Sequence, residues 1–140
     1  MTNVTDDPAH AAALAAELSS ALKDLHRALL RAEMGDDPAL NNPYTALFAL
    51  IGDPRFAWMG ALSQLIARLD QQVADGEIAE PGALADARAD AAALLGEGGQ
   101  ADPTFRLRHL TALQNDADVG LATGRLRKAL ARLPAPPADR

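Results

Sequence analysis

Three histidines are the residues of this chain best suited to chemistry, because a neutral imidazole binds metals and exchanges protons near pH 7. They are His10, His26 and His109. His26 and Glu33 are two helical turns apart, so on a helix both side chains lie along the same side. One hypothesis is therefore a pocket between helices, for a small ligand or a metal ion, where His26, Glu33, His109 and Tyr44 converge.

A simpler interpretation of His26 competes with this pocket, and we favour it. The residue adjoins an apolar stripe between Leu22 and Leu29, where a boundary histidine makes a local hydrogen bond. The Glu-x-x-His pairs that di-iron bundles carry on facing helices do not occur in the sequence. The lack of cysteine removes thiolate metal sites, thiol catalysis and disulfides. We accordingly predict no metal and no cofactor.

Nucleophilic catalysis has no candidate in the sequence pattern. Ser19, Ser20 and Ser63 fall in the middle of expected helices, away from a strained turn and from a histidine and an acid nearby in sequence. The acidic pairs at 6–7 and 36–37 flank expected helix starts, where carboxylates favour the positive end of the helix dipole. The sequence therefore predicts no catalytic residue and favours a non-enzymatic protein.

Aromatic residues are concentrated in one segment of the chain. Four of the five fall within fifteen positions, namely Tyr44, Phe48, Phe56 and Trp58. Because aromatic side chains supply large and specific packing surfaces, this segment is either part of the core or a recognition surface. We interpret Phe48 and Phe56 as packing residues at a corner between two helices.

The rest of this segment supplies the leading functional hypothesis. Arg55, Trp58 and Met59 are of the types enriched at the centres of protein interfaces. We take these three residues as a candidate interface. The favoured function is protein–protein association by a non-enzymatic helical bundle, as a homodimer, and the small-ligand or metal pocket is the alternative.

The expected elements are all helical. Asp, Asn or Glu precedes each internal proline, a pattern typical of helix starts, and leucines recur at helical spacing. We expect helices over 8–34, 43–51, 54–74, 81–95, 103–115 and 116–133, with a break or a kink at Asn115-Asp116. This predicts an all-α bundle of four main helices with one or two short additional helices, in a single domain over 1–133. Residues 134–140 are expected to form a disordered, proline-rich tail.

Two glycines in the last expected helix form a Gly-x-x-x-Gly pattern, at Gly120 and Gly124. In a membrane such a pattern marks a helix-dimer face, but this helix is too polar for lipid. We expect the two glycines to permit one close helix crossing inside the bundle.

The net charge of −6 is unevenly distributed. Residues 1–100 carry 6 basic against 15 acidic residues, whereas residues 101–140 carry 7 against 4. An acidic chain is repelled by phosphate backbones, which argues against nucleic-acid binding. A nucleic-acid or membrane regulator acting through Arg125, Arg127, Lys128 and Arg132 is the least favoured hypothesis. We expect this basic face to meet the acidic helices of its own bundle.

The N-terminal sequence and the hydropathy predict a cytoplasmic protein with no membrane partner. The start of the chain is acidic and polar, unlike a secretory signal. No apolar run approaches the ~20 residues that span a bilayer.

The aromatic segment also carries a resemblance. Its core, Gly52-Asp53-Pro54-Arg55-Phe56-Ala57-Trp58-Met59, is followed by Leu62-Ser63-Gln64-Leu65-Ile66. These stretches, together with Leu113-Gln114-Asn115-Asp116-Ala117-Asp118-Val119, resemble a group of small uncharacterised bacterial all-α proteins. The matching stretches comprise 20 of the 140 residues of the chain. The resemblance implies a compact bacterial helical domain and implies no activity, cofactor or catalytic residue.

Overall fold

The computed structural model describes residues 8–35, 44, 54–97 and 102–134. Within these residues the chain forms α-helices and 3-10 helices, and no strand. The elements are α1 (Pro8–Met34), η3 (Pro54–Met59), α3 (Gly60–Ala74), η4 (Glu77–Ala79), α4 (Ala83–Leu94), α5 (Pro103–Asn115) and α6 (Ala117–Ala131). The predicted all-α bundle is confirmed. The helix predicted over 43–51 lies outside the described residues apart from Tyr44, and so does the predicted tail apart from Pro134.

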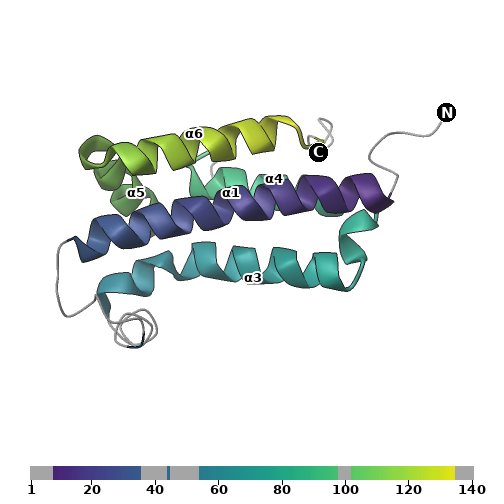
Figure 1. Ribbon diagram of the computed structural model, residues 1–140, viewed down its shortest axis with the longest axis horizontal. Coiled ribbons are helices and arrows are strands. Elements are labelled where there is room, and N and C mark those ends of the chain that lie inside the picture. The colour runs from purple at the N-terminus through teal and green to yellow at the C-terminus, as the bar shows by residue number, and fades with distance from the viewer. Residues whose placement is uncertain (1–7, 36–43, 45–53, 98–101, 135–140) are drawn as a thin grey trace.

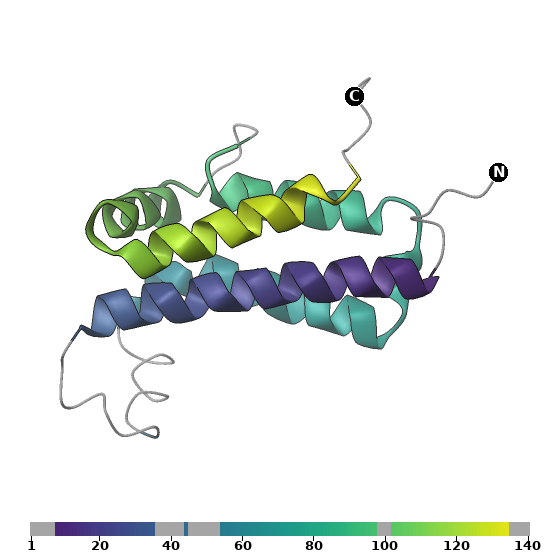
Figure 2. The same ribbon diagram turned by 45° about the horizontal axis from the view of Figure 1, so that its top comes forward.

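Helix α1 is the central element of the bundle. Its 27 residues give it a length of about 40 Å, and Figure 1 shows α3 along one side of it and α6 along the other. Apolar residues at spacings of three and four, among them Leu18, Leu22, Leu25 and Leu29, are buried against these neighbours. Both α3 and α6 run antiparallel to α1 (Figures 1 and 2).

Helix α4 completes the bundle beside α1, α3 and α6, and it packs against α3 and α6. The guanidinium of Arg88 on α4 donates through Nε to the carbonyl oxygen of Leu130 on α6 over 3.0 Å. The start of α4 differs from the prediction. The helix begins at Ala83 rather than Pro81, because Gly82 at its N-cap has a φ of +84° and interrupts the helical conformation.

Helix α3 also begins differently from the prediction. The expected helix over 54–74 starts as the 3-10 helix η3 and becomes α-helical only at Gly60. Within η3, the side chains of Phe56 and Met59 are 2% and 1% exposed and belong to the core. The prediction that Phe56 is a packing residue is confirmed.

The Asn115-Asp116 point is a break between two helices. Asp116 has extended backbone angles and caps α6, its Oδ1 accepting from the backbone N–H groups of Asp118 and Val119. Asp102 caps α5 in the same way. In Figures 1 and 2, α5 lies at the end of the bundle where α1 finishes and α6 begins, with its axis turned away from theirs. This position lets α5 face the C-terminal end of α1.

The glycines of α6 do not mediate a close helix crossing, so that prediction is wrong. Gly120 and Gly124 are exposed, and a Cβ added at either would have nothing within 4 Å. The buried face of α6 is formed instead by Val119, Leu126 and Leu130.

The basic face of α6 meets acidic residues of α1, as predicted. Arg125 lies 3.7 Å from Asp24, and Arg132 forms an ion pair with Glu17. Arg127 pairs instead with Glu97, 3.3 Å away. None of the helices in the described part of the chain is both long enough and apolar enough to cross a membrane.

Candidate functional site

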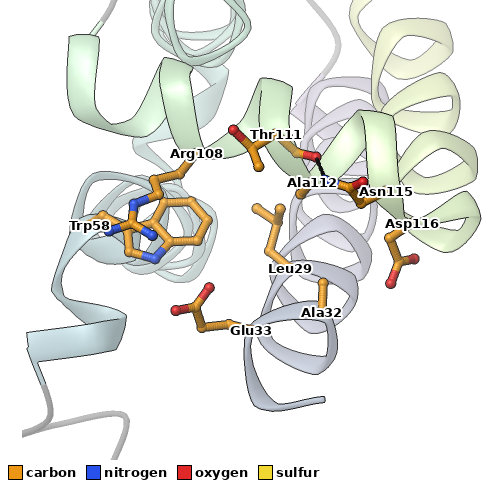
Figure 3. Close-up of a pocket in the computed structure, with 9 residues that line it drawn as sticks. All are labelled: Leu29, Ala32, Glu33, Trp58, Arg108, Thr111, Ala112, Asn115 and Asp116. Atoms are coloured by element: carbon orange, nitrogen blue, oxygen red, sulfur yellow. Dashed lines mark hydrogen bonds between the residues drawn. The ribbon is translucent and has the colours of Figure 1, made fainter.

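A cavity of about 200 Å³ opens where α1, η3 and α5 meet. Figure 3 shows its walls, which come from the last turns of α1, from Trp58 on η3, and from α5 with its junction to α6. The cavity is lined by Leu29, Ala32, Glu33, Trp58, Arg108, Thr111, Ala112, Asn115 and Asp116. It combines an apolar wall with opposite charges and an aromatic ring, which is the composition of a binding site for a small polar molecule.

Trp58 is held in place from its far side by the core. Its ring lies 5.5 Å from the ring of Phe105, centroid to centroid, with an angle of 48° between the planes. Phe105 is completely buried, so the indole cannot turn freely. Its Nε1 is buried and has no hydrogen-bond partner among the described residues. Leaving a buried donor unpaired costs about 1–3 kcal/mol.

Two side chains of opposite charge line the same cavity. Glu33, in the last turn of α1, is half-buried, and Arg108 on α5 is exposed. In Figure 3 the carboxylate of Glu33 points from α1 toward the indole of Trp58. No ion pair or hydrogen bond joins Glu33 or Arg108 to another residue in the described part of the chain. Among the described residues, both charges are therefore without a charged or hydrogen-bonded partner.

The remaining polar residues of the cavity are engaged in holding the α5–α6 junction. The hydroxyl of Thr111 donates to the carbonyl of Leu107 over 3.0 Å. The amide of Asn115 donates to the carbonyl of Thr111 over 2.9 Å. Asp116 uses one carboxylate oxygen to cap α6. These bonds fix the wall of the cavity, and the groups that they leave to meet a ligand are Trp58, Glu33, Arg108 and the second carboxylate oxygen of Asp116.

The structure does not bring the four residues of the predicted pocket together. Glu33 lines the cavity at Trp58, whereas His26 lines a different one with Ser63 and Ile66. His109 is completely buried, and Tyr44 is 75% exposed. Within the described ranges, no group of three or more His, Asp or Glu side chains is arranged to hold a metal ion. The predicted convergence is therefore wrong, and of its four residues only Glu33 belongs to the candidate site.

His26 makes a hydrogen bond between helices. Its Nε2 lies 3.1 Å from Oγ of Ser63 on α3, and burial lowers the pKa of the imidazole. This confirms the interpretation of His26 as a boundary histidine, but the predicted local hydrogen bond is wrong, because the partner lies on another helix. The pair resembles the serine–histidine part of a hydrolase site. No carboxylate of the described residues bonds the other ring nitrogen, so we assign the pair to the packing of α1 on α3.

A second serine also joins α1 to α3. Oγ of Ser19 donates to a carboxylate oxygen of Asp70 over 2.6 Å, and the ammonium of Lys23 lies 2.9 Å from the other oxygen. The hydrogen bond from Ser19, followed by the contact with Lys23, lowers the pKa of Asp70. A carboxylate with a lowered pKa is a weak base, so this cluster serves as a tie between the helices.

His109 is a core residue. Its Nε2 lies 3.0 Å from Oγ1 of Thr123, and its ring stacks against Phe105. Burial, with smaller effects from the charges of Arg106 and Arg127, lowers the pKa of His109 to about 4. The imidazole is therefore neutral near pH 7 and packs as an aromatic ring.

The three residues of the predicted interface have separate positions. Met59 is 1% exposed and belongs to the core, which corrects its assignment to a partner-facing surface. Trp58 lines the cavity. The side chain of Arg55 lies outside the described residues. Sequence reasoning missed Arg108 altogether, because no local pattern distinguishes it from the other arginines of the C-terminal segment.

Comparisons of the chain with protein-family models, with curated proteins and with solved structures gave no match.

Proposed function

We propose that the protein binds a small polar ligand in the cavity at Trp58, without carrying out chemistry on it. The observation that carries the proposal is a cavity lined by the ring of Trp58 together with Glu33 and Arg108, two opposite charges that have no ion pair among the described residues.

The size of the cavity supports a small ligand. Drug-sized ligands occupy pockets of about 300–1,000 Å³, and this cavity measures about 200 Å³. At about 30 Å³ for each water molecule in the liquid, it has the volume of roughly six or seven waters. The apolar wall of Leu29, Ala32 and Ala112 favours a molecule with a small hydrocarbon part.

Trp58 allows a direct test, because it is the single tryptophan of the chain and lines the cavity. Its fluorescence should change on titration with at least one member of a panel of amino acids, amines, carboxylic acids, sugars and nucleobases. The same compound should raise the melting temperature, since a ligand at about 100 times its Kd adds roughly 2.7 kcal/mol of stability.

A matched pair of variants locates the binding. Ala32→Met should fill the cavity and abolish the fluorescence response. Ala89→Met makes the same change on the exposed surface of α4 and should leave the response intact. A panel in which no compound alters fluorescence or melting temperature would overturn the proposal, and so would an Ala32→Met variant that binds as well as the unmodified chain.

Homodimeric association is the second proposed function. It is supported by two large apolar side chains on the α5–α6 surface, Leu107 at 67% and Leu121 at 61% exposure. Light scattering over a concentration series should give the mass of a dimer, and Leu107→Ser with Leu121→Ser should shift it toward that of a monomer. A strict monomer at high micromolar concentration would contradict this proposal. A bacterial origin and a cytoplasmic location stay predictions.

A further inference from the structure

The cavity at Trp58 holds two opposite charges that are not paired with each other. Glu33 and Arg108 both line it, yet no ion pair joins them in the described part of the chain. Arg108 is exposed and Glu33 is half-buried, so solvent screens the attraction between the two charges. Two side chains that line the same cavity without closing on each other leave room for a molecule that contacts both.

We infer that the ligand is a zwitterion that carries an amino group and a carboxylate, such as a free α-amino acid with a small apolar side chain. This inference rests on the proposed function and names the class of ligand for the same cavity. The carboxylate contacts the guanidinium of Arg108. The ammonium group contacts the carboxylate of Glu33.

The chemistry of each group fits this orientation. The planar guanidinium of arginine presents paired N–H donors that match a carboxylate. Arg108 therefore favours an anionic acceptor. A carboxylate such as Glu33 only accepts hydrogen bonds, and an ammonium group only donates them.

Ligands with a single charge fit less well. A simple amine would pair with Glu33 but would meet the charge of Arg108. A simple carboxylate would pair with Arg108 but would approach Glu33, which lines the same cavity. A zwitterion pairs with both charges at once. Leu29, Ala32 and Ala112 then face its hydrocarbon part.

The test compares three molecules that share one hydrocarbon skeleton. L-valine carries both charges, isobutylamine lacks the carboxylate, and isovalerate lacks the amine. The full-length protein is titrated with each compound, and binding is monitored by Trp58 fluorescence and by calorimetry. We expect L-valine or L-alanine to bind at least about tenfold more tightly than either single-charge analogue of L-valine.

Two variants assign the charges to their partners. Glu33→Gln should weaken L-valine about tenfold and leave isovalerate unchanged or improved, because it removes the partner of the ammonium group. Arg108→Gln should weaken L-valine by a similar factor and leave isobutylamine unchanged or improved. Matched controls are Glu77→Gln and Arg31→Gln, exposed charges that do not line the cavity. Both should bind L-valine normally.

The outcomes separate the inference from the proposed function. If the single-charge analogues bind as well as L-valine, or if only sugars or nucleobases bind, the zwitterion inference is overturned while the binding function stands. If both charge variants bind L-valine normally, the proposed contacts of the ligand with Arg108 and Glu33 are wrong, and the zwitterion inference is overturned. If no compound of any class binds, both the inference and the proposed function fail.

Discussion

The buried imidazole of His109 donates a hydrogen bond from Nε2 to Oγ1 of Thr123 over 3.0 Å. The direction of this bond follows from the hydroxyl proton, which Thr123 already donates to the carbonyl of Val119 over 2.8 Å. A hydroxyl has one proton, so Oγ1 must accept from His109. The imidazole therefore carries its proton on Nε2, and Nδ1 is left as a buried acceptor without a partner among the described residues.

The first prediction concerns stability at low pH. The pKa of His109 is about 4 in the folded protein against 6.5 ordinarily. Above pH 6.5 the imidazole is neutral in both states and contributes no pH dependence. As the pH falls from 6.5 to 4, the unfolded state binds a proton that the folded state does not, so stability decreases, by up to about 3 kcal/mol. Urea unfolding at a series of pH values measures this loss.

The control for this prediction is His109→Phe, which keeps a ring beside Phe105 and removes the titration. Its unfolding free energy should depend less steeply on pH between 6.5 and 4 than that of the unmodified chain. An NMR titration of the His109 ring should give a midpoint near 4. Equal pH dependence in the two proteins would contradict the assignment.

The second prediction compares the two hydroxyl–imidazole pairs. Thr123→Val leaves the Nε2 proton of His109 buried without an acceptor, which should cost about 1–3 kcal/mol. Ser63→Ala removes the partner of His26, but His26 is only partly buried and water can replace the hydroxyl. It should cost about 1 kcal/mol or less. Urea unfolding of both variants at pH 7.5 tests the order, and an equal cost would show that burial does not distinguish the pairs.

The third prediction concerns Gly96, which follows α4. Its φ is +85°, and a Cβ added there would lie 2.8 Å from Cζ of Arg106. Gly96→Ala should therefore destabilise the protein by about 2–3 kcal/mol, from backbone strain and from displacement of the arginine. Gly82 has nearly the same φ, +84°, with nothing within 4 Å. Gly82→Ala should cost about 1 kcal/mol from the backbone alone. Thermal unfolding of both variants isolates the contribution of Arg106.

The fourth prediction uses the exposed glycines of α6. Because a Cβ at Gly120 or Gly124 meets open space on a helix, each Gly→Ala change should stabilise the protein by about 0.5–1 kcal/mol through helix propensity. The two effects should add in the double variant, as measured by urea unfolding. A loss of stability in either single variant would point to a close contact on this face, for example with a second copy of the chain.

Helix α1 and the starts of α5 and α6 were predictable, because signals within a few residues of each specify them. The bounds of α1 match the prediction at both ends, because its leucine stripe and the flanking Asp-Pro and glycine act within one helix. The caps at Asp102 and Asp116 are local in the same sense. The 3-10 conformation of η3 was missed because a proline start and an apolar pattern suit both helix types. The start of α4 was missed because Glu80-Pro81 resembles a helix start while Gly82 takes a left-handed conformation.

The candidate site was only partly predictable, because it is a property of packing. Glu33 and Trp58 were identified by residue type, but as members of two different hypotheses. Nothing in the sequence brings Arg108 to them, since α1, η3 and α5 meet only in the folded bundle. His109 was assigned to the pocket because the sequence does not show whether a helical histidine faces a pocket or the core. Only the position of Thr123 in the folded structure shows that His109 faces the core.

The central position of α1 has a consequence for biosynthesis. This helix is translated before every other element described here, and α6, which covers one of its sides, is translated last. The apolar stripe of Leu18, Leu22 and Leu25 therefore emerges from the ribosome without its final partners. Contacts between segments distant in sequence form slowly, and apolar surface left uncovered meanwhile favours aggregation. Completion of the bundle must wait until α6 has left the ribosome, so until then α3 can cover one side of α1 while the side that α6 covers stays open.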